Sequence, residues 1–387
     1  MGLGLGKVAA PDSHASVTML ELFFDLVFVY LITALTSLIV HGDGWRGYAQ
    51  AALVLAVTFW MYDGYAWLAN NVPPTTTSTR LPMLLAMACF LAMAVVVPDV
   101  FGSGAWVFAV SYLLLVTIHA IQFGRSTLGS SAQGIRATVP INYGCAALLV
   151  LAAIVGSDLR WICWALAVAL LLATMVRRRG SSRLTVQAGH FVERHQLLVI
   201  IALGETVVAI GAGAQGELTR GWVLLAFVLA MVLICALWWV YYAVGDDELG
   251  REVVMATPEQ GRGSLALVAY SYIGLLHISG LVLVAVGLHF VVQDPVARLP
   301  WGTALTLSVG VASYLVGQAA FRARLRIGPT SPHLIASLAV LAVVPLGALV
   351  TGWLQLLGCV LVALALATVL QRAGAPGAHA AAVDSLK

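Results

Sequence analysis

The chain has 387 residues, of which 61% are hydrophobic and only 10% are charged, and its net charge is +3. Ordinary soluble domains carry roughly 25% charged residues, so this composition excludes a water-soluble globule and indicates a protein of the lipid bilayer. Nothing in so few charges suggests a nucleic-acid partner, and we expect none.

Apolar runs separated by loop-forming segments predict about twelve transmembrane helices in chain order. Each run is close to the roughly 20 residues that a helix needs to cross a bilayer. The first run has no basic stretch before it and no small-residue cleavage site after it, so we interpret it as a retained span. The runs begin near residues 17, 49, 81, 105, 140, 161, 187, 221, 264, 301, 333 and 354.

The twelve predicted spans divide into two similar six-helix halves, residues 17–178 and 179–372. The stretch "VALLLATMVRR" ends the first half and "ALALATVLQR" ends the second, which favours a parallel internal repeat. Before the halves lies a predicted cytoplasmic segment, 1–16. After them lies a low-complexity tail, 373–387, which we expect to be disordered.

The positive charges predict the orientation of the chain. With twelve spans both termini share one face, and the opposite face keeps only Arg46, Arg160, Arg220 and Arg298 of the 20 Lys and Arg residues. Cytoplasmic loops collect Lys and Arg, so both termini are predicted to be cytoplasmic. We therefore expect an all-α, multi-pass protein of the inner (plasma) membrane.

Acidic side chains recur near the cytoplasmic ends of spans one, two, seven and eight. Each one costs roughly 2.5–3.5 kcal/mol to insert, so such residues are functional candidates by default. We expect them to converge in one cavity that opens to the cytoplasm. Structural ion pairing with Arg80, Arg125 or Arg194 is the alternative. The candidate catalytic residues, which include one histidine, are Glu21, Asp25, Asp63, Glu193, His195 and Glu205.

Aromatic and amide side chains cluster at the same depth. Aromatic faces beside an acid provide good surroundings for a cation, although an interfacial aromatic belt is the simpler explanation. The candidate substrate-binding residues are Trp60, Trp67, Asn70, Asn71, Arg125, Trp238, Trp239 and Tyr242.

The segment "DDELGRE" contains a candidate metal site. Asp246 and Asp247 could hold Mg²⁺ beside a diphosphate, or they could simply begin a solvated loop. The five cysteines contain no CxxC pair, and their spacing indicates neither a disulfide framework nor a zinc site.

Two stretches, "ELFFDLVFVY" near the N terminus and "HFVERHQLLVIIALGETVVAIG" in the middle, resemble the low-temperature-requirement protein A family of bacterial membrane proteins. The resemblance covers most of residues 16–250. It implies a polytopic helical membrane protein and little about chemistry. The positions that match are Glu21, Asp25, Glu193, Arg194, His195, Gly204 and Glu205.

Two functions fit these features. The first is a membrane-embedded enzyme that acts on an apolar substrate such as an isoprenoid, by terpene-cyclase-like carbocation chemistry in an acidic, aromatic cavity. The second is a proton-coupled secondary transporter of a small solute, with Glu205 and His277 as its proton-carrying pair. The sequence identifies neither the substrate nor the oligomeric state.

Overall fold

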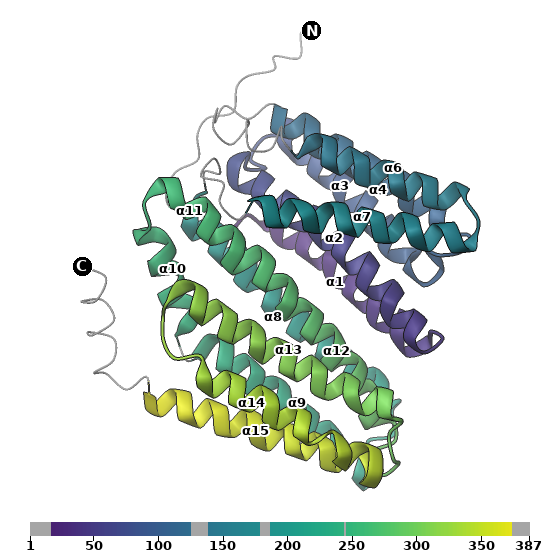
Figure 1. The fold of residues 1–387 in the computed structure, drawn as a ribbon, viewed down its shortest axis with the longest axis vertical. Coiled ribbons are helices and arrows are strands. Elements are labelled where there is room, and N and C mark those ends of the chain that lie inside the picture. The colour runs from purple at the N-terminus through teal and green to yellow at the C-terminus, as the bar shows by residue number, and fades with distance from the viewer. Residues whose placement is uncertain (1–16, 125–137, 179–185, 244, 374–387) are drawn as a thin grey trace. The chain divides into compact units, whose positions relative to one another are not determined.

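The computed structural model describes residues 17–124, 138–178, 186–243 and 245–373, and every regular element in these ranges is helical (Figure 1). The all-α class is therefore confirmed. The predicted segment 1–16, residues 374–387 of the predicted tail, and Arg125 lie outside the described residues.

The described helices follow the predicted spans closely. In the described part of the chain, eleven helices are long and apolar enough to cross a membrane, and the shorter apolar helix Val139–Ile154 corresponds to the remaining predicted span. The elements are α1 (Met19–His41), α2 (Trp45–Asn71), α3 (Thr77–Val95), η1 (Val97–Asp99), α4 (Ala105–Gly124), α6 (Val139–Ile154), α7 (Ser157–Arg178), α8 (Ala188–Ala214), α9 (Gly221–Trp238), η2 (Trp239–Ala243), α10 (Asp246–Ala256), α11 (Glu259–Ala266), η3 (Leu267–Tyr272), α12 (Ile273–Gln293), α13 (Trp301–Leu325), α14 (Ser331–Ala342), η4 (Leu346–Val350) and α15 (Gly352–Ala373).

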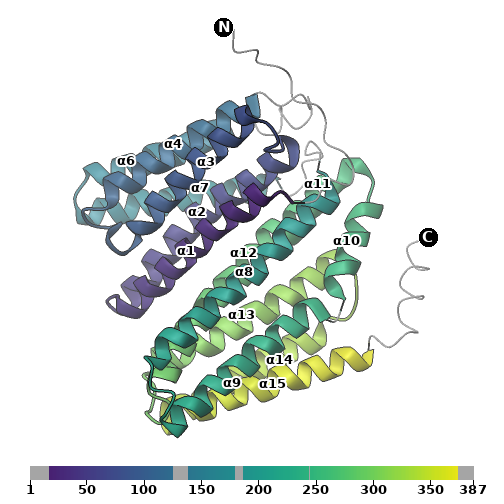
Figure 2. The same cartoon turned by 180° about the vertical axis from the view of Figure 1, so that it is seen from behind.

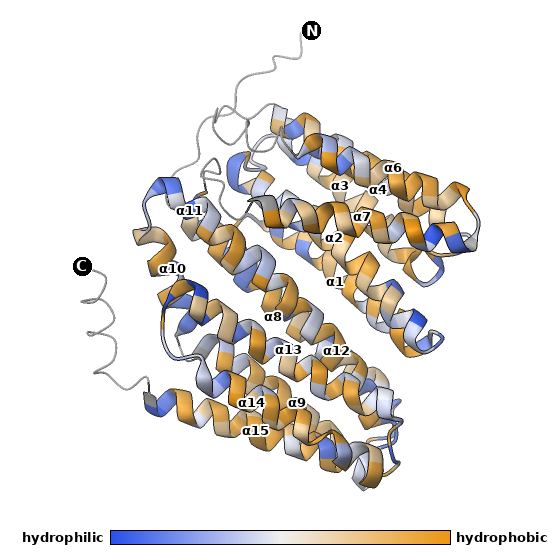
Figure 3. Cartoon of the chain, viewed as in Figure 1, coloured by the Kyte–Doolittle hydropathy of each residue, from blue (hydrophilic) through white to orange (hydrophobic). Residues whose placement is uncertain are grey.

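The surfaces of the helices suit a lipid environment. In α1 the side chains of Phe24 and Phe28 are only 1% exposed, whereas Phe23 and Leu26 are 53% and 59% exposed. Apolar residues cover the helices along their length, and hydrophilic residues gather toward helix ends and loops (Figure 3). Exposed apolar surface of this extent is stable in a bilayer and not in water.

The chain folds into two compact units. The first unit comprises residues 1–198 and 254–272, and the second comprises 199–253 and 273–387. The division falls inside α8 at Leu198, so it differs from the predicted halves 17–178 and 179–372. The six-helix repeat and the cytoplasmic termini remain predictions.

The first unit is built on α1 and α2, which pack against each other and against their neighbours in the chain. Helix α1 also packs on α3, α3 on α4, α4 on α6, and α6 on α7, while α2 contacts both α4 and α7 (Figure 2). Phe24, Phe28, Tyr62 and Tyr65 fill the space between α1 and α2 with stacked and tilted rings. This interior positions the polar residues described below.

The second unit contains the rest of α8, then α9, η2 and most of α10, and the helices from α12 onward, whereas α11 and η3 belong to the first unit. Helix α12 packs along α13, α13 on α14, α14 on α15, and α9 on both α12 and α15. Helices α12 and α13 approach closely at Gly310, where an added Cβ would lie 2.6 Å from the backbone nitrogen of Val284. Small residues allow such close helix packing inside membranes.

Candidate functional site

A buried arginine joins α8 to α1 in the first unit. Arg194 is 1% exposed. Its Nη1 donates to Oε1 of Glu21 at 3.2 Å, and its Nη2 donates to Oδ1 of Asp25 at 3.2 Å. The guanidinium carbon also lies 5.6 Å and 5.7 Å from the ring centroids of Phe24 and Tyr62, which adds cation–π attraction. For Glu21 and Asp25 the structure therefore supports the ion-pairing alternative.

The spacing of these residues explains why they meet. Glu21 and Asp25 are four residues apart on α1, and His190 and Arg194 are four apart on α8, so each pair lies along one helix face. Glu21 is further held by the first turn of α1, because its Oε2 accepts a hydrogen bond from the backbone nitrogen of Thr18 at 2.6 Å. Because Oε2 takes part in this capping box, Oε1 is available to Arg194 and His190 on α8.

The remaining partners leave an excess of carboxylate in the Arg194 cluster, which comprises Glu21, Asp25, Tyr62, His190 and Arg194. The hydroxyl of Tyr62 donates to Oδ1 of Asp25 at 2.8 Å. Nε2 of His190 lies 3.1 Å from Oε1 of Glu21, while the side-chain amide of Asn70 reaches Nδ1 at 3.3 Å. A neutral imidazole satisfies both contacts. The Arg194 cluster then holds two carboxyl groups and one guanidinium.

The two predicted substrate-binding amides have backbone partners. Asn70 donates to the carbonyl of Gln187 at 3.0 Å and accepts from the backbone nitrogen of Gln187 at 2.9 Å, so it ties the end of α2 to the start of α8. Asn71 donates to the carbonyl of Trp67 in its own helix at 2.8 Å. Their predicted binding role remains a prediction, and the structure assigns Asn70 an anchoring contact.

A second acidic group forms at the next residues of the same helices. Asp63 follows Tyr62 on α2, and His195 follows Arg194 on α8. Nε2 of His195 lies 3.1 Å from Oδ1 of Asp63, and the hydroxyl of Ser271 donates to the same oxygen at 2.6 Å. Ser271 comes from η3, a π-helical segment, and such segments often occur at functional sites.

The two contacts of the His195 ring indicate which of its nitrogens carry a hydrogen. Nδ1 of His195 lies 2.9 Å from the carbonyl of Phe191 and must donate to it. A neutral imidazole has only one N–H, so Nε2 then carries no hydrogen of its own. The contact with Asp63 is a hydrogen bond only if His195 is an imidazolium or Asp63 is a neutral acid. Both contacts of His195 are hydrogen bonds only when Asp63 and His195 together hold one proton more than a carboxylate and a neutral imidazole.

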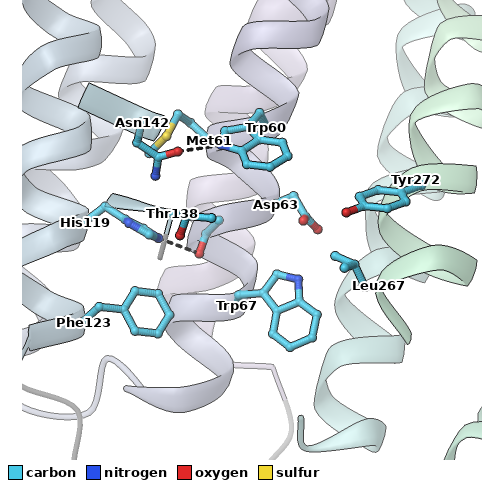
Figure 4. A pocket seen from close by; sticks show the side chains of 11 residues that line it. Trp60, Met61, Asp63, Trp67, His119, Phe123, Thr138, Asn142, Leu267 and Tyr272 are labelled. Atoms are coloured by element: carbon cyan, nitrogen blue, oxygen red, sulfur yellow. Dashed lines mark hydrogen bonds between the residues drawn. The ribbon is translucent and has the colours of Figure 1, made fainter. Parts of the chain in front are cut away.

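A pocket opens beside Asp63 within the first unit. Its empty space is about 540 Å³, including the part that is open to the outside. Figure 4 shows the Asp63 carboxylate between Trp60 and Trp67, with Tyr272 and Leu267 facing it. Both hydrogen bonds of Asp63 end on Oδ1, and its Oδ2 has no hydrogen-bond partner among the described residues. The carboxyl group thus has one oxygen available to the pocket.

The other polar groups of the pocket come from α2, α4 and α6. Nε1 of Trp60 donates to Oδ1 of Asn142 at 2.8 Å. Nε2 of His119 donates to the carbonyl of Gly64 at 3.0 Å (Figure 4), which leaves its buried Nδ1 without a partner in the described chain. Nε1 of Trp67 is also buried and has no partner there. The pocket thus combines aromatic walls with one acid, one unused acceptor and one unused donor.

Other predicted site residues lie elsewhere. Glu193 is exposed and does not face the Arg194 cluster. Glu205 is buried, but it belongs to the second unit, as do Trp238, Trp239 and Tyr242. Trp238 and Trp239 are 42% and 41% exposed, which fits an interfacial belt.

The candidate metal ligands also belong to the second unit. Asp246 is buried and forms an ion pair with Arg322 at 3.1 Å, whereas Asp247 is half-buried. Among the described residues, no group of three His, Cys, Asp or Glu side chains lies close enough to bind a metal ion. The Mg²⁺ site remains a prediction, and the ion pair gives Asp246 another role.

Sequence reasoning overlooked several members of these groups. Tyr62 and His190 could have been found, because each lies beside or four residues from a predicted residue. Ser271 could not, since it lies in the apolar stretch "LVAYSY" and meets Asp63 only through the fold. Asn142 likewise reaches the pocket from α6, a helix with no predicted site residue.

A model of the bacterial low temperature requirement A protein (LtrA) family matches residues 16–368. The chain belongs to this family. It is also 26% identical over 317 residues to an "Uncharacterized protein RA0937" from Rhizobium meliloti (strain 1021), a match that covers 77% of this chain and 75% of that protein.

The match covers both of the motif stretches noted above, including the Arg194 cluster and the residues that hold Asp63. Together, the bacterial family and the apolar helices identify a multi-pass integral membrane protein.

Proposed function

We propose that this protein is an enzyme of the bacterial inner membrane that isomerises or cyclises an apolar alkene of the isoprenoid class, with Asp63 as its general acid. One observation carries the proposal. Asp63 receives both of its hydrogen bonds on Oδ1 and has Oδ2 available beside an aromatic pocket.

The proposed reaction needs only the proton that Asp63 shares with His195. The O–H bond of Asp63 breaks as a C–H bond forms at one alkene carbon, which leaves a carbocation on the other carbon. Attack by a second double bond, or a shift of the first, redistributes that charge. A neighbouring carbon then loses a proton to the Asp63 carboxylate, which restores an alkene and regenerates the acid, so the sequence is redox-neutral.

The surroundings of Asp63 suit such an intermediate. Trp60, Trp67 and Tyr272 line the pocket, and aromatic faces attract a positive charge within about 6 Å. The hydrogen bond from Ser271 stabilises the carboxylate that remains after proton transfer. The predicted orientation supports entry of the substrate from the cytoplasmic leaflet, since Asp63 lies in the last third of α2.

The proposal is tested with the purified full-length protein in lipid nanodiscs in D₂O. Farnesyl and geranylgeranyl diphosphates and their alcohols are supplied, and products are analysed by gas chromatography and mass spectrometry. We expect isomerised or cyclised products that carry one deuterium. Asp63→Asn should lower their rate of formation by about 100-fold or more, which is the effect of losing a general acid.

Glu193→Gln is the matched control, because it removes an exposed acid from the same unit and should leave the rate unchanged. Asp63→Asn should also accumulate normally, since Asp63 contacts His195 and Ser271, so the substitution leaves no arginine unpaired. The proposal is wrong if the wild-type protein changes none of these substrates, or if Asp63→Asn retains full activity.

Proton-coupled transport is the second candidate function. The excess carboxyl group of the Arg194 cluster, together with the proton shared by Asp63 and His195, resembles the proton-binding groups of membrane carriers. On this alternative, Asp63→Asn would abolish proton-driven solute uptake into vesicles and leave exchange of solute for solute intact. Uptake by vesicles, with no change of prenyl substrates, would favour the transporter.

A further inference from the structure

The second unit contains a row of buried polar side chains in which several ring and amide atoms lack a hydrogen bond of normal geometry to the described residues. His277, Gln318 and His333 are 2%, 1% and 0% exposed. Nε2 of His277, both amide atoms of Gln318 and both ring nitrogens of His333 have no hydrogen bond of normal geometry to any described residue. These orphaned atoms come from three neighbouring helices, α12, α13 and α14.

Helix α13 arranges these groups in order. Tyr314, Gln318 and Arg322 follow one another at intervals of four residues, so they lie along one face at steps of about 6 Å. At the inner end, the ring centroid of His277 lies 5.3 Å from that of Tyr314 and 5.7 Å from that of Tyr241. We call the set His277, Tyr314, Gln318, Arg322 and His333 the α13 row.

The outer end of the α13 row is an ion pair. Nη1 of Arg322 donates to Oδ2 of Asp246 at 3.1 Å, while Nε of Arg322 has no partner in the described chain. The charge of Arg322 also acts on the neighbouring His333. The α13 row therefore leads from a charged group at the start of α10 to an imidazole in the interior of the unit.

The inner end is shaped by the absence of a side chain at Gly317. A Cβ there would lie 2.8 Å from both Cδ2 and Nε2 of His277, so the imidazole ring packs directly on the backbone of α13. The contact brings His277 beside Gln318, on the face that carries the α13 row.

Burying these ring and amide atoms without hydrogen-bond partners is energetically unfavourable. A buried donor or acceptor without a partner is destabilising, because it has lost its hydrogen bonds to water. The three side chains His277, Gln318 and His333 present five such atoms. Buried groups of this kind in folded proteins normally bind internal water, which makes two to four hydrogen bonds. Apolar side chains at these positions would give a more stable fold, so we infer that the polar side chains and their water have a function.

We propose that internal water molecules occupy the α13 row and form a proton path from the Asp246–Arg322 pair to His277. His277 accepts a proton from the path at its unpaired Nε2, and the ion pair exchanges protons with the aqueous side. This assigns a proton-handling site to the second unit, independently of the reaction proposed at Asp63.

The water is tested by X-ray hydroxyl-radical footprinting of the full-length protein in nanodiscs, in which radicals made from bound water oxidise adjacent side chains. Tyr65 is the dry reference, because it is 1% exposed and its hydroxyl donates to the carbonyl of Leu115 at 2.9 Å. We expect the oxidation of Tyr314 and His277 to be at least about tenfold faster than that of Tyr65. Equal rates would overturn the proposal.

The proton path is tested by exchange of imidazole N–H for deuterium, followed by NMR of ¹⁵N-histidine-labelled protein, with His277→Asn used to assign the signal. Gln318→Leu removes the polar group between His277 and Arg322 while nearly preserving volume. We expect it to slow exchange at His277 at least tenfold, with no change at the exposed His41. Unchanged exchange at His277 would overturn the proposal.

A stability measurement keeps this test independent of folding. Gln355 is the matched control in the same unit, because its Nε2 donates to the carbonyl of Ala304 at 2.6 Å and to Oγ of Ser308 at 2.9 Å. Gln355→Leu loses two protein hydrogen bonds and should lower the melting temperature. Gln318→Leu loses the proposed water contacts and the side-chain contact with His277, and should lower it less. A melting temperature lowered as far by Gln318→Leu would contradict hydration of this side chain.

Discussion

Replacing Arg194 by methionine should destabilise the first unit strongly. Methionine retains much of the aliphatic length of arginine and removes the guanidinium. Glu21 and Asp25, whose side chains are both 0% exposed, would then face each other without a cation. Breaking a buried ion pair in this way typically costs about 3–5 kcal/mol, because the remaining charges are left uncompensated.

Removing the carboxylates of Glu21 and Asp25 together with Arg194 should restore much of the lost stability. In the triple variant E21Q/D25N/R194M no carboxylate is stranded, so most of the lost stability should return. Arg194→Lys should fall between the wild type and Arg194→Met, since an ammonium keeps the charge and lacks the fork that reaches both carboxylates. The order of stability is therefore wild type, the triple variant or lysine, and then methionine.

The assay is thermal unfolding of the purified full-length protein in detergent, read by intrinsic fluorescence. With a shift of about 2–4 °C per kcal/mol for a unit of this size, Arg194→Met should lower the melting temperature by about 6–20 °C. The reasoning is refuted if Arg194→Met melts within 2 °C, roughly, of the wild type. It is also refuted if E21Q/D25N/R194M is less stable than Arg194→Met alone.

Three further predictions follow from the same contacts. Glu193→Gln should change the free energy of unfolding by less than about 0.5 kcal/mol in a melting experiment, because Glu193 is exposed; a loss comparable to that of Arg194→Met would show a buried role. Gly317→Ala should destabilise the protein by about 1–3 kcal/mol, since its Cβ would lie 2.8 Å from the ring of His277, and normal stability would contradict this packing. A C-terminal reporter that is active only in the periplasm should stay silent, and an active reporter would contradict the predicted topology.

The helices were predictable because the bilayer imposes a simple rule. A span must satisfy its own backbone and present apolar side chains to lipid, so runs of apolar residues mark helices regardless of tertiary contacts. Helix α6 shows the limit of this rule. The described helix, Val139–Ile154, is shorter than a full span, although its apolar run predicts one.

The candidate site was only partly predictable, because a uniformly apolar span does not indicate which face of its helix points into the protein. Glu21, Asp25, Asp63 and His195 were all named as candidates from the sequence. In the structure Glu21 and Asp25 contact Arg194, whereas Asp63 contacts His195, so they form two groups. The partner of Asp63 on η3 was invisible, since nothing in an apolar sequence marks Ser271 as different from its neighbours.

The stretch "HFVERH" shows how rotation around one helix assigns three different roles. Each residue turns the chain by about 100°, so consecutive side chains point in different directions. Arg194 faces Glu21 and Asp25, whereas His195, one residue later, faces Asp63, and Glu193, one residue earlier, is exposed. The sequence analysis named Glu193 and His195 together as candidate catalytic residues and Arg194 only as a possible ion-pair partner, because the direction in which each side chain points depends on packing.

The same rotation links the two acidic groups of the first unit. Tyr62 and Asp63 are neighbours on α2, just as Arg194 and His195 are neighbours on α8. The contacts of Tyr62 and Arg194 with α1 hold these two helices in position. They thereby also position Asp63 and His195, which contact each other. The ion pairs of Arg194 hold α8 against α1 at the depth of Asp25. Nε2 of His195 is thereby kept 3.1 Å from Oδ1 of Asp63, beside the pocket. The Arg194 cluster, although it lines no part of the pocket, therefore positions the acid that we propose to be catalytic.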